Sequence, residues 1–237
     1  MGAKQIPTVE EPGIFTEVAF TNEGFVEILS NDKFDVCMQY PLLHMKNAEK
    51  CCLVRREVYV RLLMAQEYLP DGYRIKILDA WRPFALQEEL YNVYSDRIIK
   101  EFHSESSPEH EKAALIRKFV SEPIADQNIP PVHTTGGAVD VTLVDTNGNE
   151  LDMGTEFDSF GIATHTDYFE HISVSSEDSK RVQCIRDNRR LLYDVMTHAG
   201  FINLPSEWWH FDYGDRFWAY YTNRPAIYAG VFSRSEM

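Results

Sequence analysis

The chain has 237 residues, of which 44% are hydrophobic and 25% charged, a composition typical of a globular protein with one sizeable core. Its formal net charge of −14 argues against nucleic acid or an anionic membrane as a partner, because an acidic surface repels phosphate groups. No apolar run approaches the ~18–20 residues of a membrane span, and residues 1–11 lack the apolar stretch and cleavage site of a secretory signal. We therefore expect one domain over residues 1–237, located in the cytoplasm.

The four cysteines show no Cys-x-x-Cys pairing. Adjacent Cys51 and Cys52 fall on a segment that we expect to be helical, where they cannot easily bridge each other. We predict that Cys37, Cys51, Cys52 and Cys184 are reduced thiols, as in a cytoplasmic protein.

Hydrophobic periodicity outlines the first half of the chain. Apolar residues at three- to five-residue steps predict helices, and apolar–polar alternation predicts strands. The first 47 residues are otherwise irregular and are expected to pack on the rest of the domain. The patterns predict strands at 18–20 and 24–29, a helix over 48–69, a strand over 73–81, a helix over 84–102 and a short helix over 109–120.

The second half follows the same logic. A Gly-Gly turn precedes a strand over 138–144, and the aromatic-rich segment 207–213 is strand-like. Ser175 is placed to cap a long helix that runs to Ala199, and Gly200 suits its end. Because strands and helices mix without a βαβα rhythm, the sequence predicts an α+β fold.

His133 and Asp140 are the first candidate site residues. They flank a turn that contains Gly136 and Gly137, which lets the backbone fold back so that the imidazole and the carboxylate converge. Asp140 interrupts an otherwise apolar strand, where a carboxylate is costly to bury unless it is paired or bound to a metal. A turn-capping aspartate beside a loop histidine is the alternative explanation.

Glu207 and His210 are the second candidate pair, three residues apart among large aromatic rings. Positions i and i+3 of a regular strand face opposite sides, so the chain must bend if both serve one site. We expect His210 on the strand and Glu207 on the loop before it. Three protein ligands, a free position for water and a carboxylate that is not a ligand are what zinc hydrolysis requires. A structural aromatic strand is the alternative.

Arg82 and an acidic stretch complete the candidates. Arg82 precedes Pro83 at a strand end, so its direction is restricted, and a guanidinium fixed near a metal can stabilise a developing oxyanion. A surface salt bridge is the simpler explanation for Arg82. The stretch 152–158 carries carboxylates suited to a substrate ammonium, although turn formation explains Asp152 equally well.

Taken together, these segments resemble the D-alanyl-D-alanine dipeptidase family of zinc peptidases, which shares its fold with D,D-carboxypeptidases and the hedgehog signalling domain. The matching stretches occur in the family's order and span roughly residues 50–213. They are DAWRP at 79–83, HTTGGAVD at 133–140, DMGTEFD at 152–158, DNRRLL at 187–192 and EWWH at 207–210.

The resemblance implies an α+β fold with a central, mostly antiparallel sheet flanked by helices. It also implies one zinc ion per chain, with His133, Asp140 and His210 as ligands and Glu207 as the catalytic base. The implied activity is the hydrolysis of a small dipeptide, most notably D-alanyl-D-alanine, during cell-wall synthesis or breakdown.

The resemblance further implies how the substrate is held. Arg82 would stabilise the oxyanion, Asp158 would pair with the free amino group of the dipeptide, and Tyr40 would assist at that amino group. This sequence departs from the family where serines help to hold the substrate carboxylate just before the first histidine, because here those positions are Pro131 and Val132. Another hydroxyl, from Thr134 or Thr135, is the expected substitute.

Two other functional classes fit parts of this pattern. Two histidines and a carboxylate also form the site of non-haem iron oxygenases, but there the carboxylate commonly follows the first histidine by two residues, and Glu207 would have no task. A non-catalytic, zinc-stabilised binding module is the second alternative, and the presence of Glu207 and Arg82 argues against it. A D,D- or L,D-carboxypeptidase acting on wall peptides is a variant of the same hydrolase hypothesis. The oligomeric state stays open.

Overall fold

A computed structural model describes residues 4–173 and 178–237. Within them the main sheet has five strands in the order β2-β4-β5-β7-β6. β2 runs parallel to β4 and the other neighbouring strands are antiparallel, so the predicted mostly antiparallel sheet is confirmed. The strands are β2 (Phe34–Val36), β4 (Arg74–Asp79), β5 (Ala138–Val144), β6 (Ile202–Asn203) and β7 (His210–Asp212).

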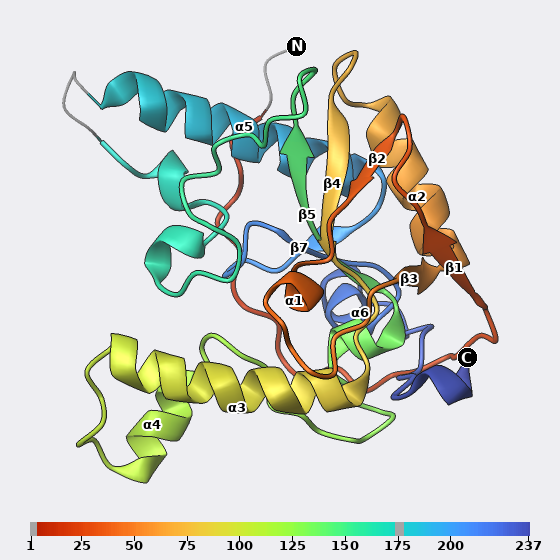
Figure 1. The fold of residues 1–237 in the computed structure, drawn as a ribbon, viewed down its shortest axis with the longest axis vertical. Helices are drawn as coiled ribbons and strands as arrows, with labels where there is room; N and C mark the ends of the chain where they lie inside the picture. Colours follow the sequence, from red (N-terminus) through yellow and green to blue (C-terminus); the bar gives the residue numbers. More distant parts are fainter. Residues whose placement is uncertain (1–3, 174–177) are drawn as a thin grey trace.

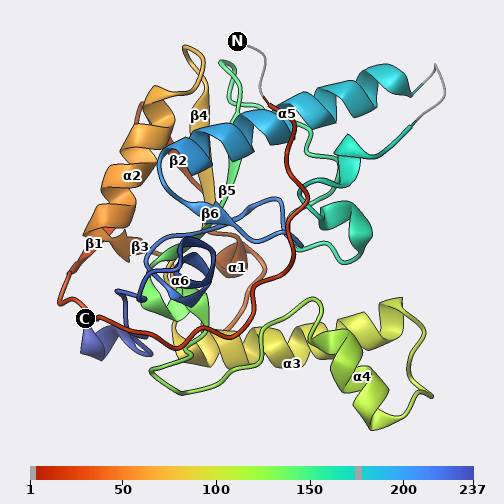
Figure 2. The same cartoon turned by 180° about the vertical axis from the view of Figure 1, so that it is seen from behind.

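Helices flank this sheet, as the α+β prediction requires. Figure 2 shows α5 (Ser179–His198) crossing one face of the sheet, where it contacts α2 (Arg56–Glu67). Figure 1 shows α3 (Phe84–Glu101) lying across the end at which β4 finishes, with α4 (Glu109–Ile116) packed against it. The end of the sheet that faces α3 therefore carries the ends of β4 and β7 and the beginning of β5.

β5 has the bounds that the sequence predicts, because strong turns stand on both sides of it. Gly136 lies in the left-handed region, with φ +73°, and a Cβ there would collide with the ring of Phe25. A Cβ on Gly137 would collide with the carbonyl oxygen of Tyr213. These two glycines let the chain reverse tightly between the loop of His133 and the strand.

The helix predicted over 48–69 is wrong in its first part. Its beginning is instead the strand β3 (Cys52–Arg55), which pairs antiparallel with β1 (Phe25–Ile28), so Cys52 is not helical. The structure gives a physical reason, since all four residues of β3 are buried and Arg55 donates to the carbonyl oxygen of Thr135 at 2.7 Å. That hydrogen bond anchors the loop that follows His133, which a helix in place of β3 would not reach.

Other predicted elements differ in smaller ways. The expected strand at 18–20 is only an isolated bridge between Val18 and Ala226, because no neighbouring strand continues the pairing. The N-terminal 47 residues contain β2 and a short helix, α1 (Gln39–Leu42), and the helix α6 (Arg216–Thr222) follows β7, none of which the pattern indicated. The cap predicted at Ser175 lies outside the described residues.

Three further observations concern the whole described part of the chain. Residues 4–6 donate backbone hydrogen bonds to Asp194 and Glu170, so the N-terminal segment packs against α5 and its neighbours, as expected. The four cysteines are unpaired. Among the described helices, none combines the length and apolar character needed to cross a bilayer.

Candidate metal centre

Three predicted ligands come together at the end of the sheet that faces α3. His133 lies on a 3-10 turn, Asp140 on β5, and His210 begins β7 directly opposite Asp140 in the antiparallel register. One donor atom from each residue lies within 4.8 Å of the other two. His210 Nδ1 is 3.0 Å from Asp140 Oδ1 and 3.2 Å from His133 Nε2. The sequence prediction that these three side chains converge is therefore confirmed.

Neighbouring acceptors orient both imidazoles. His133 Nδ1 lies 2.8 Å from the carbonyl oxygen of Ala80, and His210 Nε2 lies 2.9 Å from Asp212 Oδ1. Each of these nitrogens therefore carries the proton and donates it. The other ring nitrogens, His133 Nε2 and His210 Nδ1, both face Asp140. Carbonyl and carboxylate partners of this kind hold metal-binding histidines in the correct tautomer.

The electrostatics of the three groups favour a cation between them. Burial alone would raise the pKa of Asp140, but the adjacent imidazoles of His133 and His210 hold it below its ordinary value. Burial acts to lower the pKa of His210, yet the carboxylates of Asp212 and Asp140 raise it well above its usual range. All three candidate ligands are at most 5% exposed. Two imidazole nitrogens and a carboxylate oxygen turned toward one point are the donor set of a divalent metal site, where the cation would take the place of a proton on His210 Nδ1.

Glu207 stands beside this cluster on a turn, as the spacing argument predicted. Its backbone N–H donates to Leu204, and its carbonyl oxygen accepts from the N–H of His210. This turn brings Glu207 Oε2 to 3.8 Å from His210 Nδ1, and 27% of the Glu207 side chain remains exposed. Burial raises the pKa of Glu207 to about 8. The carboxylate is thus near the donor cluster without belonging to it.

Arg82 reaches the site from the segment between β4 and α3. It forms two hydrogen bonds to Asp79 Oδ2, at 2.8 and 3.0 Å, and a third to Gln87 Oε1 at 2.8 Å. Nη2, one of the two nitrogens bonded to Asp79, also donates to the hydroxyl of Tyr40 at 3.2 Å and lies 3.7 Å from Asp140 Oδ2. These contacts fix the guanidinium at the edge of the cluster.

Asp158 and Tyr40 lie on the α3 side of the same cavity. Asp158 has φ +55°, a left-handed conformation that is uncommon outside glycine and that often marks functional sites. The hydroxyl of Tyr94 donates to Asp158 Oδ2 at 2.7 Å. Burial raises the pKa of Asp158 to about 6, while the hydrogen bond from Tyr94 acts to lower it. The structure therefore brings both sequence-predicted residues to the cavity.

Sequence reasoning missed several residues that hold this region together. Arg189, within the DNRRLL segment, is buried and donates to the carbonyl oxygens of Met153, His165 and Ala163, so it ties the loop before Asp158 to a second loop. That segment was the signal that pointed to it. The other missed residues are Asp79, Gln87, Tyr94 and Asp212.

The expectation that a threonine replaces the family's serines is wrong. The hydroxyl of Thr134 donates to the carbonyl oxygen of Pro131 at 2.7 Å, and that of Thr135 donates to Val132 at 2.6 Å. Both threonines are at most 1% exposed. Their hydroxyls hold the 3-10 turn together and do not face the cavity.

The cluster lines a small cavity of about 60 Å³, which also contains Asp158 and Glu207. A larger hollow of about 680 Å³, called the vestibule below, shares Glu207, Leu204 and Phe217 with it. The vestibule contains none of the three donors and adjoins the cavity at these shared residues.

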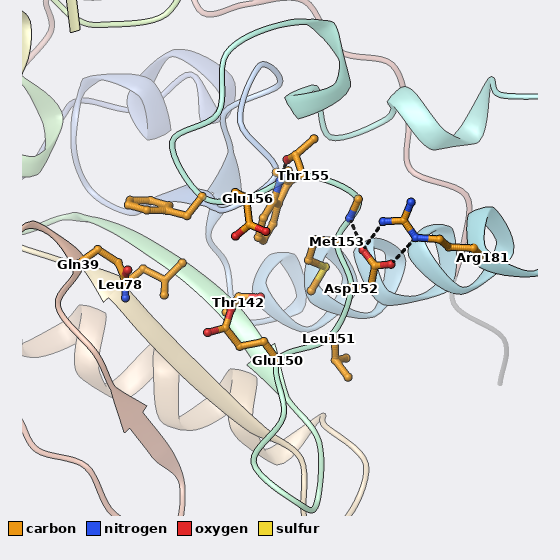
Figure 3. Close-up of a pocket in the computed structure, with 13 residues that line it drawn as sticks. Gln39, Leu78, Thr142, Glu150, Leu151, Asp152, Met153, Thr155, Glu156 and Arg181 are labelled. Carbon is orange, nitrogen blue, oxygen red and sulfur yellow. Dashed lines mark hydrogen bonds and ion pairs between the residues drawn. The ribbon is translucent and has the colours of Figure 1, made fainter. Parts of the chain in front are cut away.

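A separate hollow of about 490 Å³ lies on another part of the sheet, near Thr142 and Glu150 (Figure 3). Arg181 reaches across from α5 to form an ion pair with Asp152 at 2.8 Å. Asp152 is thus engaged there and does not join Asp158 at the cavity. This hollow contains no member of the donor cluster and is not the candidate centre.

A buried set of two imidazoles and one carboxylate, with a further carboxylate beside it on a cavity, defines the class as a metal-dependent hydrolase. Comparison with known proteins identifies the family within this class. The chain belongs to the D-ala-D-ala dipeptidase family of peptidases, whose sequence model matches residues 43–228.

Three bacterial relatives are called D-alanyl-D-alanine dipeptidase. The chain is 30% identical over 181 residues to the D-alanyl-D-alanine dipeptidase of Synechocystis, with 73% of each chain covered. It is 29% identical to the Escherichia coli D-alanyl-D-alanine dipeptidase, with 68% of this chain and 66% of that protein covered. The match to the Enterococcus faecalis protein is 32% identical and covers 60% and 58%.

Two solved structures of the vancomycin-resistance D,D-peptidase VanY are more distantly similar. One, in complex with Zn(II), is 15% identical, with a TM-score of 0.39 over 76% of this chain and 85% of that one. The other, in complex with D-alanine-D-alanine, is 14% identical, with a TM-score of 0.40 over 76% and 84%.

Proposed function

We propose that this protein hydrolyses D-alanyl-D-alanine with one zinc ion held by His133, Asp140 and His210. The observation that carries the proposal is the buried cluster of these three donors beside Glu207, in a chain of the D-ala-D-ala dipeptidase family. These residues line a small cavity, which also contains Asp158 and Arg82. The names of the bacterial relatives support the same dipeptide.

The donor set fits zinc better than the common alternatives. Zinc in hydrolases takes three protein ligands of the imidazole and carboxylate type and keeps a further position for water. Magnesium and calcium prefer oxygen donors alone, whereas two of the three donors here are nitrogens. When bound, zinc would supply Lewis-acid polarisation of the carbonyl and a water molecule of lowered pKa.

Glu207 is the residue that we propose as general base and then general acid. It lies on the cavity wall without being one of the donors, and its carboxylate is partly exposed toward the substrate space. A carboxylate in this position takes the proton of the attacking water and returns it to the leaving amine. Burial raises its pKa, which makes the ionised carboxylate a stronger proton acceptor.

Arg82 and Asp158 are proposed to hold the two polar groups of the substrate on either side of the metal. Arg82 would donate to the carbonyl oxygen as negative charge develops there. Asp158, with Tyr40 assisting, would pair with the free amino group of the dipeptide. A longer peptide chain at that position would leave the buried carboxylate unpaired, which selects for dipeptides.

Zinc-loaded protein assayed against D,D-, L,D- and L,L-alanyl-alanine tests this function. We expect about one zinc ion per chain and preferential cleavage of the D,D dipeptide, with loss of activity on chelation and recovery on addition of zinc. Metal analysis of protein purified without added metal distinguishes zinc from the iron of an oxygenase. Bound zinc without cleavage of any dipeptide would support the non-catalytic binding module instead.

The remaining predictions concern the setting of the enzyme. We propose that residues 1–237 form one catalytic domain, that it works in the cytoplasm and that it serves cell-wall peptide metabolism. The unpaired state of the four cysteines supports a reducing compartment. The net charge of −14 agrees with the absence of a nucleic acid partner.

A further inference from the structure

The segment just before His133 lacks the hydroxyl groups that the family uses for the substrate carboxylate. Pro131 and Val132 have no hydroxyl, and those of Thr134 and Thr135 are bonded to backbone carbonyls. Val132 also packs with Phe217 in an apolar cluster. A carboxylate that met only these groups would lose its hydration without compensation.

Arg216 stands next to this segment at the start of α6. The carboxylate of Asp215 caps that helix by accepting from the backbone N–H groups of Phe217 and Trp218, at 3.0 and 3.1 Å, which fixes where Arg216 leaves the helix. Arg216 Nε then donates to the carbonyl oxygen of Pro130 at 3.1 Å. Its guanidinium carbon lies 4.2 Å from the centroid of the Phe217 ring. The cation is therefore held beside the positions where serines would otherwise stand.

The two terminal nitrogens of this guanidinium have no acceptor among the described residues, and no carboxylate lies within ion-pair distance. Arg216 is half-buried and lines the vestibule together with Glu207. An arginine remains charged at any physiological pH, so a half-buried one without an acid partner is an anion site. The hydrogen bond from Nε and the contact with the Phe217 ring hold the guanidinium in place. The terminal N–H groups stay free for a bidentate contact with a carboxylate.

The other charges of the vestibule are mixed. Arg117 and Lys118, which follow α4, add positive charge, and His165 lies on the same wall. Glu11 and Glu207 are the acids there. Glu207 is assigned to the proton transfers, and burial raises the pKa of Glu11 above its ordinary value. The balance favours a carboxylate.

We propose that Arg216 is a specificity-determining residue that binds the C-terminal carboxylate of the substrate in place of the family's serines. The inference rests on the proposed dipeptidase function, with the amino group at Asp158. Two extended residues span about 7 Å, so a dipeptide whose amino group lies at Asp158 runs past Glu207 toward the vestibule, where the cavity and the vestibule share Glu207, Leu204 and Phe217. The substrate class is then an unblocked dipeptide with both termini free.

The test compares D-alanyl-D-alanine with its C-terminal amide, in zinc-loaded protein. We expect Arg216→Gln to lower kcat/KM for the free acid about 5- to 10-fold, mainly through KM, because a charge-assisted but half-exposed contact is lost. Hydrolysis of the amide is expected to change less than about 3-fold, since it carries no charge to be matched. Arg216→Lys should recover part of the preference for the acid. Arg224→Gln, an exposed arginine at the far end of the same helix region, is the matched control for loss of one charge.

The outcomes separate the inference from the function that it deepens. An unchanged ratio of acid to amide hydrolysis in a folded, zinc-containing Arg216→Gln protein overturns the inference and leaves the dipeptidase intact. Equal rates on the free acid and the amide in the unaltered protein would also overturn the inference while leaving the dipeptidase function intact. Absence of cleavage of either substrate in the unaltered protein overturns the proposed function. If Arg216→Gln unfolds, Arg216→Lys decides, because loss of bidentate geometry should still lower the acid-to-amide ratio.

Discussion

The two ends of the candidate cavity are built differently. At the end near α3, Asp158 accepts a hydrogen bond from Tyr94 at 2.7 Å, and Tyr40 is 2% exposed. At the other end the cavity meets a vestibule of about 680 Å³, in which Arg216 has no acid partner among the described residues. Asp158, Tyr40 and Tyr94 do not line that vestibule.

This difference indicates how selectivity is divided along a dipeptide. A buried carboxylate held by hydrogen bonds is organised before the substrate binds, so it penalises any substrate that lacks a matching ammonium. A half-exposed guanidinium is solvated before binding, and its contact with a carboxylate is weaker and more easily screened by salt. We therefore expect the amino end to discriminate more strictly than the carboxylate end.

The largest effect is expected at the junction of the two ends, where Glu207 lines both the cavity and the vestibule. Glu207→Gln keeps the shape of the side chain but removes the proton acceptor. We predict that kcat falls by at least ~10²-fold, the usual scale for a positioned acid–base group. Zinc content and the affinity for the dipeptide should stay near those of the unaltered protein, because neither end is altered.

Initial rates of D-alanyl-D-alanine hydrolysis, measured with equal amounts of zinc-loaded protein, give kcat for the variant and the unaltered protein. Metal content is determined in parallel. Glu156→Gln, an exposed carboxylate of the separate hollow, is the control for loss of one negative charge. A Glu207→Gln protein with near-normal kcat would remove Glu207 from its proposed role.

A smaller effect is predicted for the amino end. Asp158→Asn removes the charge that matches the substrate ammonium, and we expect kcat/KM for D-alanyl-D-alanine to fall about 10- to 100-fold. The N-acetylated dipeptide, which has no ammonium, should be a very poor substrate of the unaltered protein and should lose little further in the variant. If acetylation were tolerated as well as C-terminal amidation, the two ends would not differ in strictness.

Parts of this site were predictable because their signals are local. The Gly136-Gly137 turn before a strand that contains Asp140, and a histidine three residues after a glutamate, both constrain the backbone within a few residues. Those signals correctly placed the three donors together and Glu207 on the preceding turn. The bounds of β5 followed from turn residues on both of its sides.

The remainder depends on contacts between distant segments. The strand Cys52–Arg55 has apolar spacing that also suits a helix, and only its pairing with Phe25–Ile28 decides for a strand. Tyr94 belongs to the ordinary buried stripe of α3, so nothing in its neighbourhood marks it as the partner of Asp158. Arg216 is positioned by its hydrogen bond to the carbonyl oxygen of Pro130, 86 positions away in the sequence, so its neighbours in sequence do not mark it as a site residue.

The smallest predicted effect concerns the pH dependence of the amino end. Burial raises the pKa of Asp158 to about 6. Below that pH the carboxyl group of the free protein is neutral and cannot attract the ammonium, whereas the substrate ammonium, with an ordinary pKa near ~8, stays charged. The affinity for D-alanyl-D-alanine should therefore be full above about pH 6 and decrease as the pH falls through that value.

Calorimetric titrations in the Glu207→Gln background measure this affinity without turnover and without the titration of Glu207. Tyr94→Phe removes a hydrogen bond that stabilises the ionised form of Asp158, so the pKa of Asp158 should rise and the midpoint should move to higher pH. At pH 8, where Asp158 is ionised in both proteins, the same variant should bind the dipeptide only about 2- to 10-fold more weakly, since a single hydrogen bond that orients Asp158 is lost. A midpoint that stays in place or moves to lower pH would mean that Tyr94 does not hold Asp158 in its charged form, and the strict selectivity of the amino end would then need another source.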